Sequence, residues 1–232
     1  MTNSMPPTAV HAAPTTGLDA PLGSVSRPSW RGRLHLISLW LAIPLLVLLA
    51  LQSDGARSRA AVIVYGVGLC SMLAVSTTYH RWVHTIRARA AWRRADHATI
   101  FAAIAGTCTA LTLTTLTTGR AIAMLLVIWI AAAIGAAFKL VSFHRANRLG
   151  IAMYIALGWA GLVLVPAVWN RGGATAVVML LGGGVLYTVG AIGFARKWPT
   201  LRPARFSYHE VWHAFTIAAA GLHFAAVHSL AT

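Results

Sequence analysis

The sequence predicts an all-α membrane protein: a bundle of seven transmembrane helices with the N-terminus in the cytoplasm and the C-terminus outside. Three observations predict it, namely an apolar composition, apolar stretches long enough to span a bilayer, and basic residues distributed unevenly between the connections. Of the 232 residues, 58% are hydrophobic and only 10% are charged. Soluble domains carry about 25% charged residues, so most of this chain cannot face water.

A helix that crosses the hydrocarbon core needs roughly 20 apolar residues. The stretches that meet this length are the predicted spans, and they cover residues 34–51, 60–82, 97–116, 121–143, 149–168, 174–194 and 208–230. The sixth contains three consecutive glycines, Gly182 to Gly184, where we expect a neighbouring helix to approach closely. Residues 1–29 are rich in Pro, Thr, Ser and Ala, which predicts a disordered cytosolic tail before a transmembrane domain at 30–232.

The basic residues indicate the orientation of the chain. With a cytosolic N-terminus, the tail and the second, fourth and sixth connections face inward, and they hold 15 of the 19 Lys and Arg residues. The outward connections hold Arg57, Arg59, Arg120 and Arg171. Cytoplasmic loops carry an excess of Lys and Arg, so this bias predicts the stated topology. Membrane orientation and contact with anionic lipid headgroups therefore account for the net charge of +15. We expect no nucleic-acid partner.

The histidines indicate a metal site near the cytosolic face. His80 ends the second predicted span, while His209 and His213 lie in the first two turns of the seventh. His209 and His213 are four residues apart, so their directions differ by about 40° around the helix and they can share one ion. Three neutral imidazoles leave a fourth tetrahedral position open, which is typical of catalytic zinc. The donor set favours Zn²⁺ among the available metals.

Two polar residues lie at the same predicted depth. Asp96 begins the third predicted span, and Ser76 precedes His80 by four residues, which places its hydroxyl on the same helix face. We assign both to catalysis, Asp96 as the group that holds the water or orients a ligand. Two structural alternatives stay open: Asp96 as the N-cap of its helix, and Ser76 bonded to its own backbone.

The string His209-Glu210-Val211-Trp212-His213 matches HExxH, in which the glutamate is the general base of zinc metalloproteases. Ser207 and Glu210 also form a capping-box pattern at a helix start, and we favour this structural interpretation. His35 begins the first span at a compatible depth and is a candidate neighbour of the site. His223 lies about 21 Å further along the last helix than His209, so it cannot share the metal.

The residues of this site resemble those of a known family. The segments STTYH (76–80), DHATIFAAIAGTCT (96–109) and SYHEVWHAFTIAAAGLHF (207–224) are similar to the hemolysin III family. That family belongs with the progestin and adipoQ receptors and is more distantly similar to alkaline ceramidases. The resemblance extends over nearly all of the chain after residue 30. Many bacterial members carry an acidic residue at the start of the first helix, where this chain has Arg31, Arg33 and His35.

The resemblance implies one zinc ion near the cytosolic face, held by His80, His209 and His213, with Ser76 and Asp96 beside its water. From it we expect a multi-pass protein of the bacterial plasma membrane. The leading hypothesis is a zinc-dependent hydrolase of lipid amides or esters. The alternatives are a membrane-perturbing or pore-forming haemolysin, and a receptor or regulator with structural zinc. The membrane lipid is the expected partner, and the sequence does not define the substrate or the oligomeric state.

Overall fold

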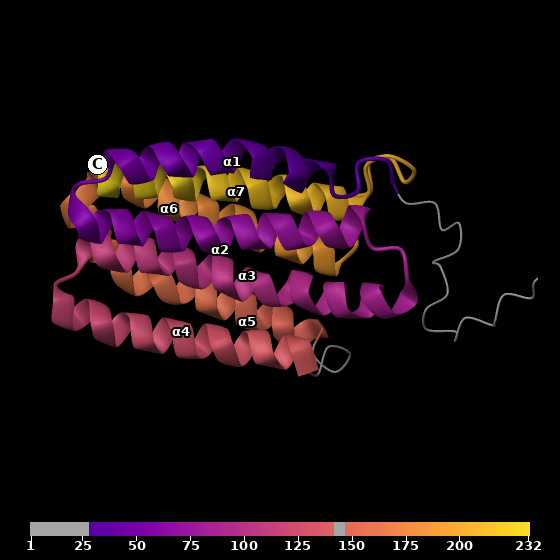
Figure 1. Ribbon diagram of the computed structural model, residues 1–232, viewed down its shortest axis with the longest axis horizontal. Helices are drawn as coiled ribbons and strands as arrows, with labels where there is room; N and C mark the ends of the chain where they lie inside the picture. Colours follow the sequence, from indigo (N-terminus) through magenta and orange to yellow (C-terminus); the bar gives the residue numbers. More distant parts are fainter. Residues whose placement is uncertain (1–27, 142–146) are drawn as a thin grey trace, which may run out of the picture.

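The computed structural model describes residues 28–141 and 147–232, and within them the chain is a bundle of long helices (Figure 1). All but two residues of the predicted disordered tail lie outside the described residues. The elements, in chain order, are α1 (Arg33–Gln52), α2 (Gly55–Arg81), α3 (Ile86–Thr115), α4 (Thr118–Val141), α5 (Asn147–Ala160), the short 3₁₀ helix η1 (Gly161–Leu164), α6 (Val165–Ala195) and α7 (Tyr208–Ala231). The all-α prediction is therefore confirmed for the described part of the chain.

Six helical segments among the described residues are long and apolar enough to cross a membrane. One of them, Leu149–Ala195, has 47 residues and combines α5, η1 and α6. It contains Gly173, whose backbone is non-helical at φ 67 and ψ −166. Across this break, Trp159 Nε1 donates a hydrogen bond to Thr188 Oγ1 at 3.0 Å, so α5 lies beside the later part of α6. The chain therefore turns back on itself within this segment.

The exterior of the bundle is apolar. In α1 only His35, Leu46 and Leu49 are buried, while large side chains such as Trp40 and Leu51 are about 70% exposed, at 69% and 70%. A water-soluble monomer rarely exposes apolar surface so extensively, whereas a bilayer favours it. The long helices are thus built to face lipid on the outside and one another on the inside.

Close contacts between helices depend on glycine. A Cβ atom at Gly68 of α2 would lie 2.7 Å from the carbonyl oxygen of Ala102 in α3, so a side chain there would push the two helices apart. In α6, a Cβ atom at Gly183 would lie 3.1 Å from the carbonyl oxygen of Ala219 in α7 and closer still to the His223 ring. The predicted close approach at the consecutive glycines is confirmed, and small residues at such crossings are typical of membrane helices.

Helix α3 begins earlier than the apolar stretch predicts. It starts at Ile86, where the Thr85 side chain caps it by accepting a hydrogen bond from Ala88 N at 3.2 Å. The Arg- and Ala-rich stretch before Asp96 is therefore helical, because both residues are strong helix formers and need no membrane to form a helix. Figure 1 shows this end of α3 extending beyond its neighbours. The N-cap interpretation of Asp96 is wrong, since the residue lies in the helix interior.

Candidate metal centre

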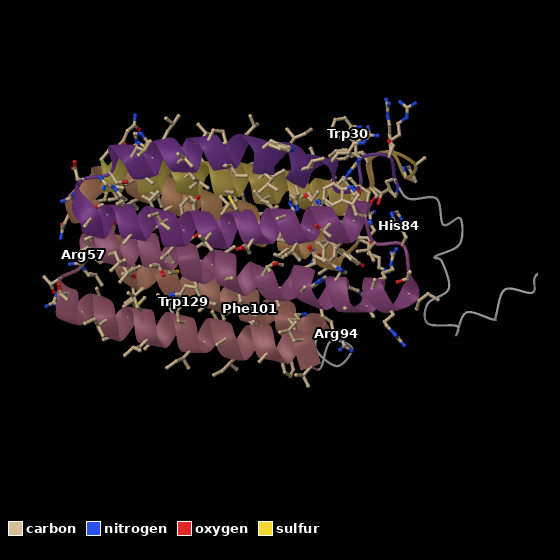
Figure 2. All side chains as sticks on the ribbon, viewed as in Figure 1. Trp30, Arg57, His84, Arg94, Phe101 and Trp129 are labelled. Atoms are coloured by element: carbon tan, nitrogen blue, oxygen red, sulfur yellow. The ribbon has the colours of Figure 1, made fainter. Side chains whose placement is uncertain are left out.

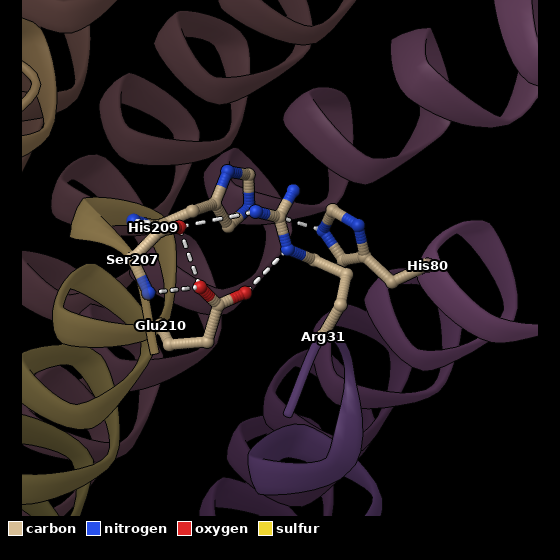
Figure 3. Close-up of polar contacts among 5 residues, drawn as sticks. All are labelled: Arg31, His80, Ser207, His209 and Glu210. Carbon is tan, nitrogen blue, oxygen red and sulfur yellow. Dashed lines mark hydrogen bonds and ion pairs between the residues drawn. The ribbon is translucent and has the colours of Figure 1, made fainter. Parts of the chain in front are cut away.

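The predicted ligands converge between the end of α2 and the start of α7. One ligand atom each from His80, His209 and His213 lies within 4.8 Å of the other two. His80 Nε2 and His209 Nε2 are 3.1 Å apart, and Figure 3 shows these two rings facing each other. Two nitrogens bound to one tetrahedral zinc at 2.0–2.1 Å would be about 3.4 Å apart, so the separation of His80 and His209 is close to that of two ligands of one ion. The three histidines could hold a metal ion.

His35 of α1 supports this cluster without joining it. Its ring stacks on that of His213 with centroids 3.8 Å apart and planes inclined by 11°. Imidazole lone pairs lie in the ring plane, so two nearly parallel stacked rings cannot both point at one ion. His35 is buried, and neither of its ring nitrogens has a hydrogen-bond partner among the described residues. Its predicted place as a neighbour of the site is confirmed.

Glu210 is the acid of the capping box. Its Oε2 accepts hydrogen bonds from Ser207 N at 2.8 Å and from Ser207 Oγ at 2.6 Å, while its Oε1 forms an ion pair with Arg31 Nε (Figure 3). Arg31 also donates to Ser207 Oγ at 3.2 Å. Both carboxylate oxygens are thus engaged away from the imidazoles, and the capping interpretation is confirmed. Arg31, the noted departure at the start of the first helix, is the partner of this buried acid.

Ser76 and Asp96 meet on the other side of the histidines. The two side chains, from α2 and α3, interact, and both line the same cavity. The Asp96 side chain is 12% exposed, and its Oδ2 lies 3.6 Å from His97 Nδ1. The structure therefore places the two predicted catalytic residues together. The alternative for Ser76 was a hydrogen bond to the backbone of its own helix. Its side chain instead interacts with the carboxylate of Asp96.

A cavity of about 170 Å³ connects these groups. Its lining includes Ser76, Asp96, His209 and His213, and it extends along α7 as far as His223. Apolar side chains form most of its walls, among them Met72, Ile100, Ile104, Leu111 and Leu180. The polar residues of the candidate centre thus open on an apolar chamber inside the bundle, which is the general form of a site for an amphipathic small molecule.

His223 has its own environment within this cavity. Its Nε2 lies 3.1 Å from the carbonyl oxygen of Leu180 in α6, and its ring packs against Gly183. It does not belong to the group that could hold a metal ion, in agreement with the prediction from helix rise. Two Thr side chains of α3 are bonded within their own helix, because Thr107 and Thr114 donate to the backbone carbonyls of Ala103 and Ala110.

Lys139 is a charged cavity residue that sequence reasoning missed. Lys139 was counted among the basic residues of a cytosolic connection, yet it lies inside α4, is 1% exposed and lines the cavity. Its position in the sequence could have identified it, because Lys139 is the only charged residue of α4 after Arg120. A lysine within an apolar helix is costly to bury and marks a functional position by default.

The family follows from comparison with known proteins. The pattern of the family described as haemolysin-III related matches residues 24–224. The chain belongs to the haemolysin-III-related family. It is 31% identical to Hemolysin-3 of Bacillus cereus over 193 residues, covering 82% of this chain and 85% of that protein. It is 27% identical to a Hemolysin-3 homolog of Bacillus subtilis (strain 168), covering 79% and 84% of the two chains.

A more distant relative comes from an animal. This haemolysin-III-related chain is 26% identical to the human monocyte to macrophage differentiation factor over 195 residues, covering 81% of this chain and 79% of the human protein. The similarity to all three relatives therefore extends over most of the bundle and is not confined to the histidine segments.

The capping box yields a first prediction. Ser207→Ala should lower the stability of the folded protein by about 1–2 kcal/mol through loss of the cap. Glu210→Gln can keep the capping hydrogen bond and should lower stability because Arg31 loses its ionic partner. Both variants should still bind a metal ion, since neither residue faces the ligand atoms, but with lower affinity because the start of α7 is anchored less firmly. Thermal unfolding in detergent and metal content by mass spectrometry measure the two effects. A Glu210→Gln protein of wild-type stability that had lost all metal-dependent activity would instead identify Glu210 as the general base.

Proposed function

We propose that the protein is a membrane-embedded, zinc-dependent hydrolase of lipid amides or esters, with zinc held by His80, His209 and His213. The observation that carries the proposal is the convergence of these imidazoles beside a cavity that also contains the Ser76–Asp96 pair. Three neutral nitrogen donors leave a coordination position open for water or substrate, as in catalytic zinc sites. A structural zinc site would instead have a fourth protein ligand, and the stacked geometry of His35 argues against that role.

The surrounding residues suit hydrolysis of an acyl compound. Bound zinc would supply Lewis acidity, polarising the acyl carbonyl and favouring deprotonation of water. The Asp96 carboxylate, oriented by Ser76, would accept the proton from the attacking water and return it to the departing amine or alcohol. The products would be a carboxylic acid and the free amine or alcohol. The apolar walls would hold the acyl chain and exclude bulk water from the reacting groups.

We further propose seven membrane crossings with the N-terminus in the cytoplasm. The 47-residue segment has about twice the length that one crossing needs, and its reversal at Gly173 supports two antiparallel crossings. The excess of basic residues is on the end of the bundle that carries the histidines. Figure 2 shows His84 and Arg94 at this end and Arg57 at the other. The similarity to Bacillus proteins supports a bacterial plasma membrane.

Experiments can distinguish the hydrolase from two alternatives, a membrane-lysing protein and a regulator with structural zinc. The name of the Bacillus cereus relative, Hemolysin-3, suggests membrane lysis, which would require ion leakage that survives loss of the histidines. Thr107 and Thr114 of α3, the best candidates for a polar pore lining, donate hydrogen bonds to carbonyl groups of their own helix, which gives this alternative little support. A regulator with structural zinc would lose stability without the ion and would never turn over a lipid.

The topology predicts which positions a membrane-impermeant thiol reagent can reach. In a background with Cys70 and Cys108 replaced by alanine, single cysteines at Asp54 and Asn170 should react in intact cells. Both are exposed at the end of the bundle assigned to the outside, Asp54 before α2 and Asn170 in α6 shortly before the break at Gly173. A cysteine at Ala204, in the connection before α7, should react only after lysis. Protection of Asn170→Cys in intact cells would eliminate the seven-crossing arrangement, and labelling of Ala204→Cys would reverse the orientation.

The metal assignment predicts about one zinc ion per chain in the purified wild-type protein. His80→Ala and His213→Ala should each lose most of it, since two imidazoles bind zinc much more weakly than three. His84→Ala is the matched control, because His84 is an exposed histidine shortly after α2 and is not in the metal-binding group. Mass spectrometry of detergent-purified protein measures the content. Zinc-free wild-type protein, prepared without chelator, would remove the hydrolase mechanism.

The base assignment predicts that Asp96→Asn keeps its zinc and loses activity. Removal of a general base lowers the rate by about 10²–10⁴-fold, and the fall should appear in kcat for N-oleoyl amides. Asp54→Asn is the control, because Asp54 is exposed at the start of α2, at the opposite end of the bundle. Equal turnover by the Asp96→Asn and wild-type proteins would contradict the assigned role.

A further inference from the structure

We propose that the lipid substrate carries an acidic group, a carboxylate or a phosphate, on the amine or alcohol side of its scissile bond, and that Lys139 binds it. The proposal specifies the substrate class of the hydrolase proposed above and rests on that function for its chemistry. The binding site itself rests on separate observations. These are the burial of Lys139 in the cavity wall, the space that Gly150 leaves for it, and the charge balance at this end of the cavity.

Lys139 is built into the protein and does not extend to the membrane surface. Lysines near helix ends usually direct the ammonium group toward the lipid headgroups, but this side chain is 1% exposed. Its Nζ lies 5.5 Å from the ring centroid of Tyr154 in α5, within range of a cation–π contact. Both Lys139 and Tyr154 line the cavity. The fold thus directs one cation inward, toward the space that the substrate would occupy.

Gly150 of α5 makes the room for this ammonium group. A Cβ atom at Gly150 would lie 2.1 Å from Lys139 Nζ and 2.1 Å from its Cε, so any other residue would force the lysine to move. The end of the side chain therefore rests against the backbone of α5. A side chain at position 150 would therefore require the end of Lys139 to shift.

The charges around Lys139 favour an anion. The chain has four acidic residues in all, of which Asp54 lies at the opposite end of the bundle and Glu210 is held by Arg31. Among the described residues, Asp96 is the remaining carboxylate. Lys139 lies close enough to both Arg93 and His97 for electrostatic repulsion between charged forms. Positive charge therefore exceeds negative charge at this wall, and a divalent ion on the histidines would add to the excess. A negatively charged substrate group would be attracted to this wall.

The candidate anion site and the metal centre belong to the same cavity. Its lining includes Lys139, His209 and His213. A carbonyl group at the histidines can therefore have its head-side substituent at Lys139. The acyl chain then extends into the apolar part of the cavity beside Leu111 and Leu180. Lysine binds carboxylate and phosphate as a compact point charge, so the site requires the charge and tolerates either geometry.

The test compares N-oleoylglycine with N-oleoylethanolamine, which share the acyl chain and the amide and differ in one carboxylate. Binding to the zinc-containing protein is measured by stopped-flow tryptophan fluorescence before turnover, because Trp159 and Trp212 line the cavity. The wild-type protein should bind N-oleoylglycine about tenfold more tightly, as expected for one charge-assisted hydrogen bond. Lys139→Met should remove this preference and leave the affinity for N-oleoylethanolamine unchanged. Lys139→Arg should retain part of it.

A second pair of variants tests the site without removing the charge. Gly150→Ala should reduce the preference by displacing the ammonium group, while Gly221→Ala, an exposed helical position with nothing within 4 Å of the added Cβ, should not. Equal affinities for the two lipids in the wild-type protein would overturn the proposal, as would an undiminished preference in folded Lys139→Met. If Lys139→Met does not fold, an undiminished preference in Gly150→Ala overturns it.

The outcomes separate this proposal from the hydrolase. A preference for N-oleoylglycine that depends on Lys139, without turnover of either lipid, would support the anion site and refute the hydrolase. Turnover of both lipids at equal rates and affinities would support the hydrolase and refute the anion site. Zinc content and thermal unfolding are measured for each variant, so a loss of structure cannot be mistaken for a loss of recognition.

Discussion

The ion pair between Arg31 and Glu210, together with the capping box around Ser207, fixes the start of α7 against the start of α1. Helix ends fray unless their free backbone groups are bonded. Two of the three candidate ligands lie in the first turns of α7, so an unanchored start would leave His209 and His213 without fixed positions. The stacking of His35 on His213 adds a second contact from α1. The geometry of the candidate centre therefore depends on an interaction that includes no ligand.

The HExxH string illustrates how position within a helix decides the role of a motif. Successive residues of a helix differ in direction by about 100°, so Glu210 cannot share the face on which His209 and His213 lie. At the third position of the helix its side chain instead reaches back to Ser207. The same string inside a long helix would have no free N–H groups to bind. The capping pattern two residues before the histidine therefore carried more information than the metalloprotease motif.

Most of the candidate site could be predicted because the spans and their directions determine the depth of each residue in the membrane. Once the spans and their direction are set, His80, His209 and Asp96 must lie at the same level, and helix periodicity pairs His209 with His213. The start of α3 was missed because hydropathy finds only the apolar part of a helix, while its Arg-rich part is polar. Lys139 was missed for the converse reason: basic residues near span ends were assigned to loops. Its inward direction depends on Gly150 in another helix, a contact that hydropathy and charge counts do not contain.

The cavity has a polar end and an apolar end. The histidines, the Ser76–Asp96 pair and Lys139 gather at one end, and beyond them the walls are mostly apolar as far as His223. An amphipathic lipid matches this arrangement in a single orientation, with its head among the polar groups and its chain in the apolar part. In the proposed topology that end faces the cytoplasmic leaflet, so substrate and product would exchange with that leaflet. Burial of the chain would supply most of the binding free energy, and the polar end would determine which lipids place a carbonyl at the metal.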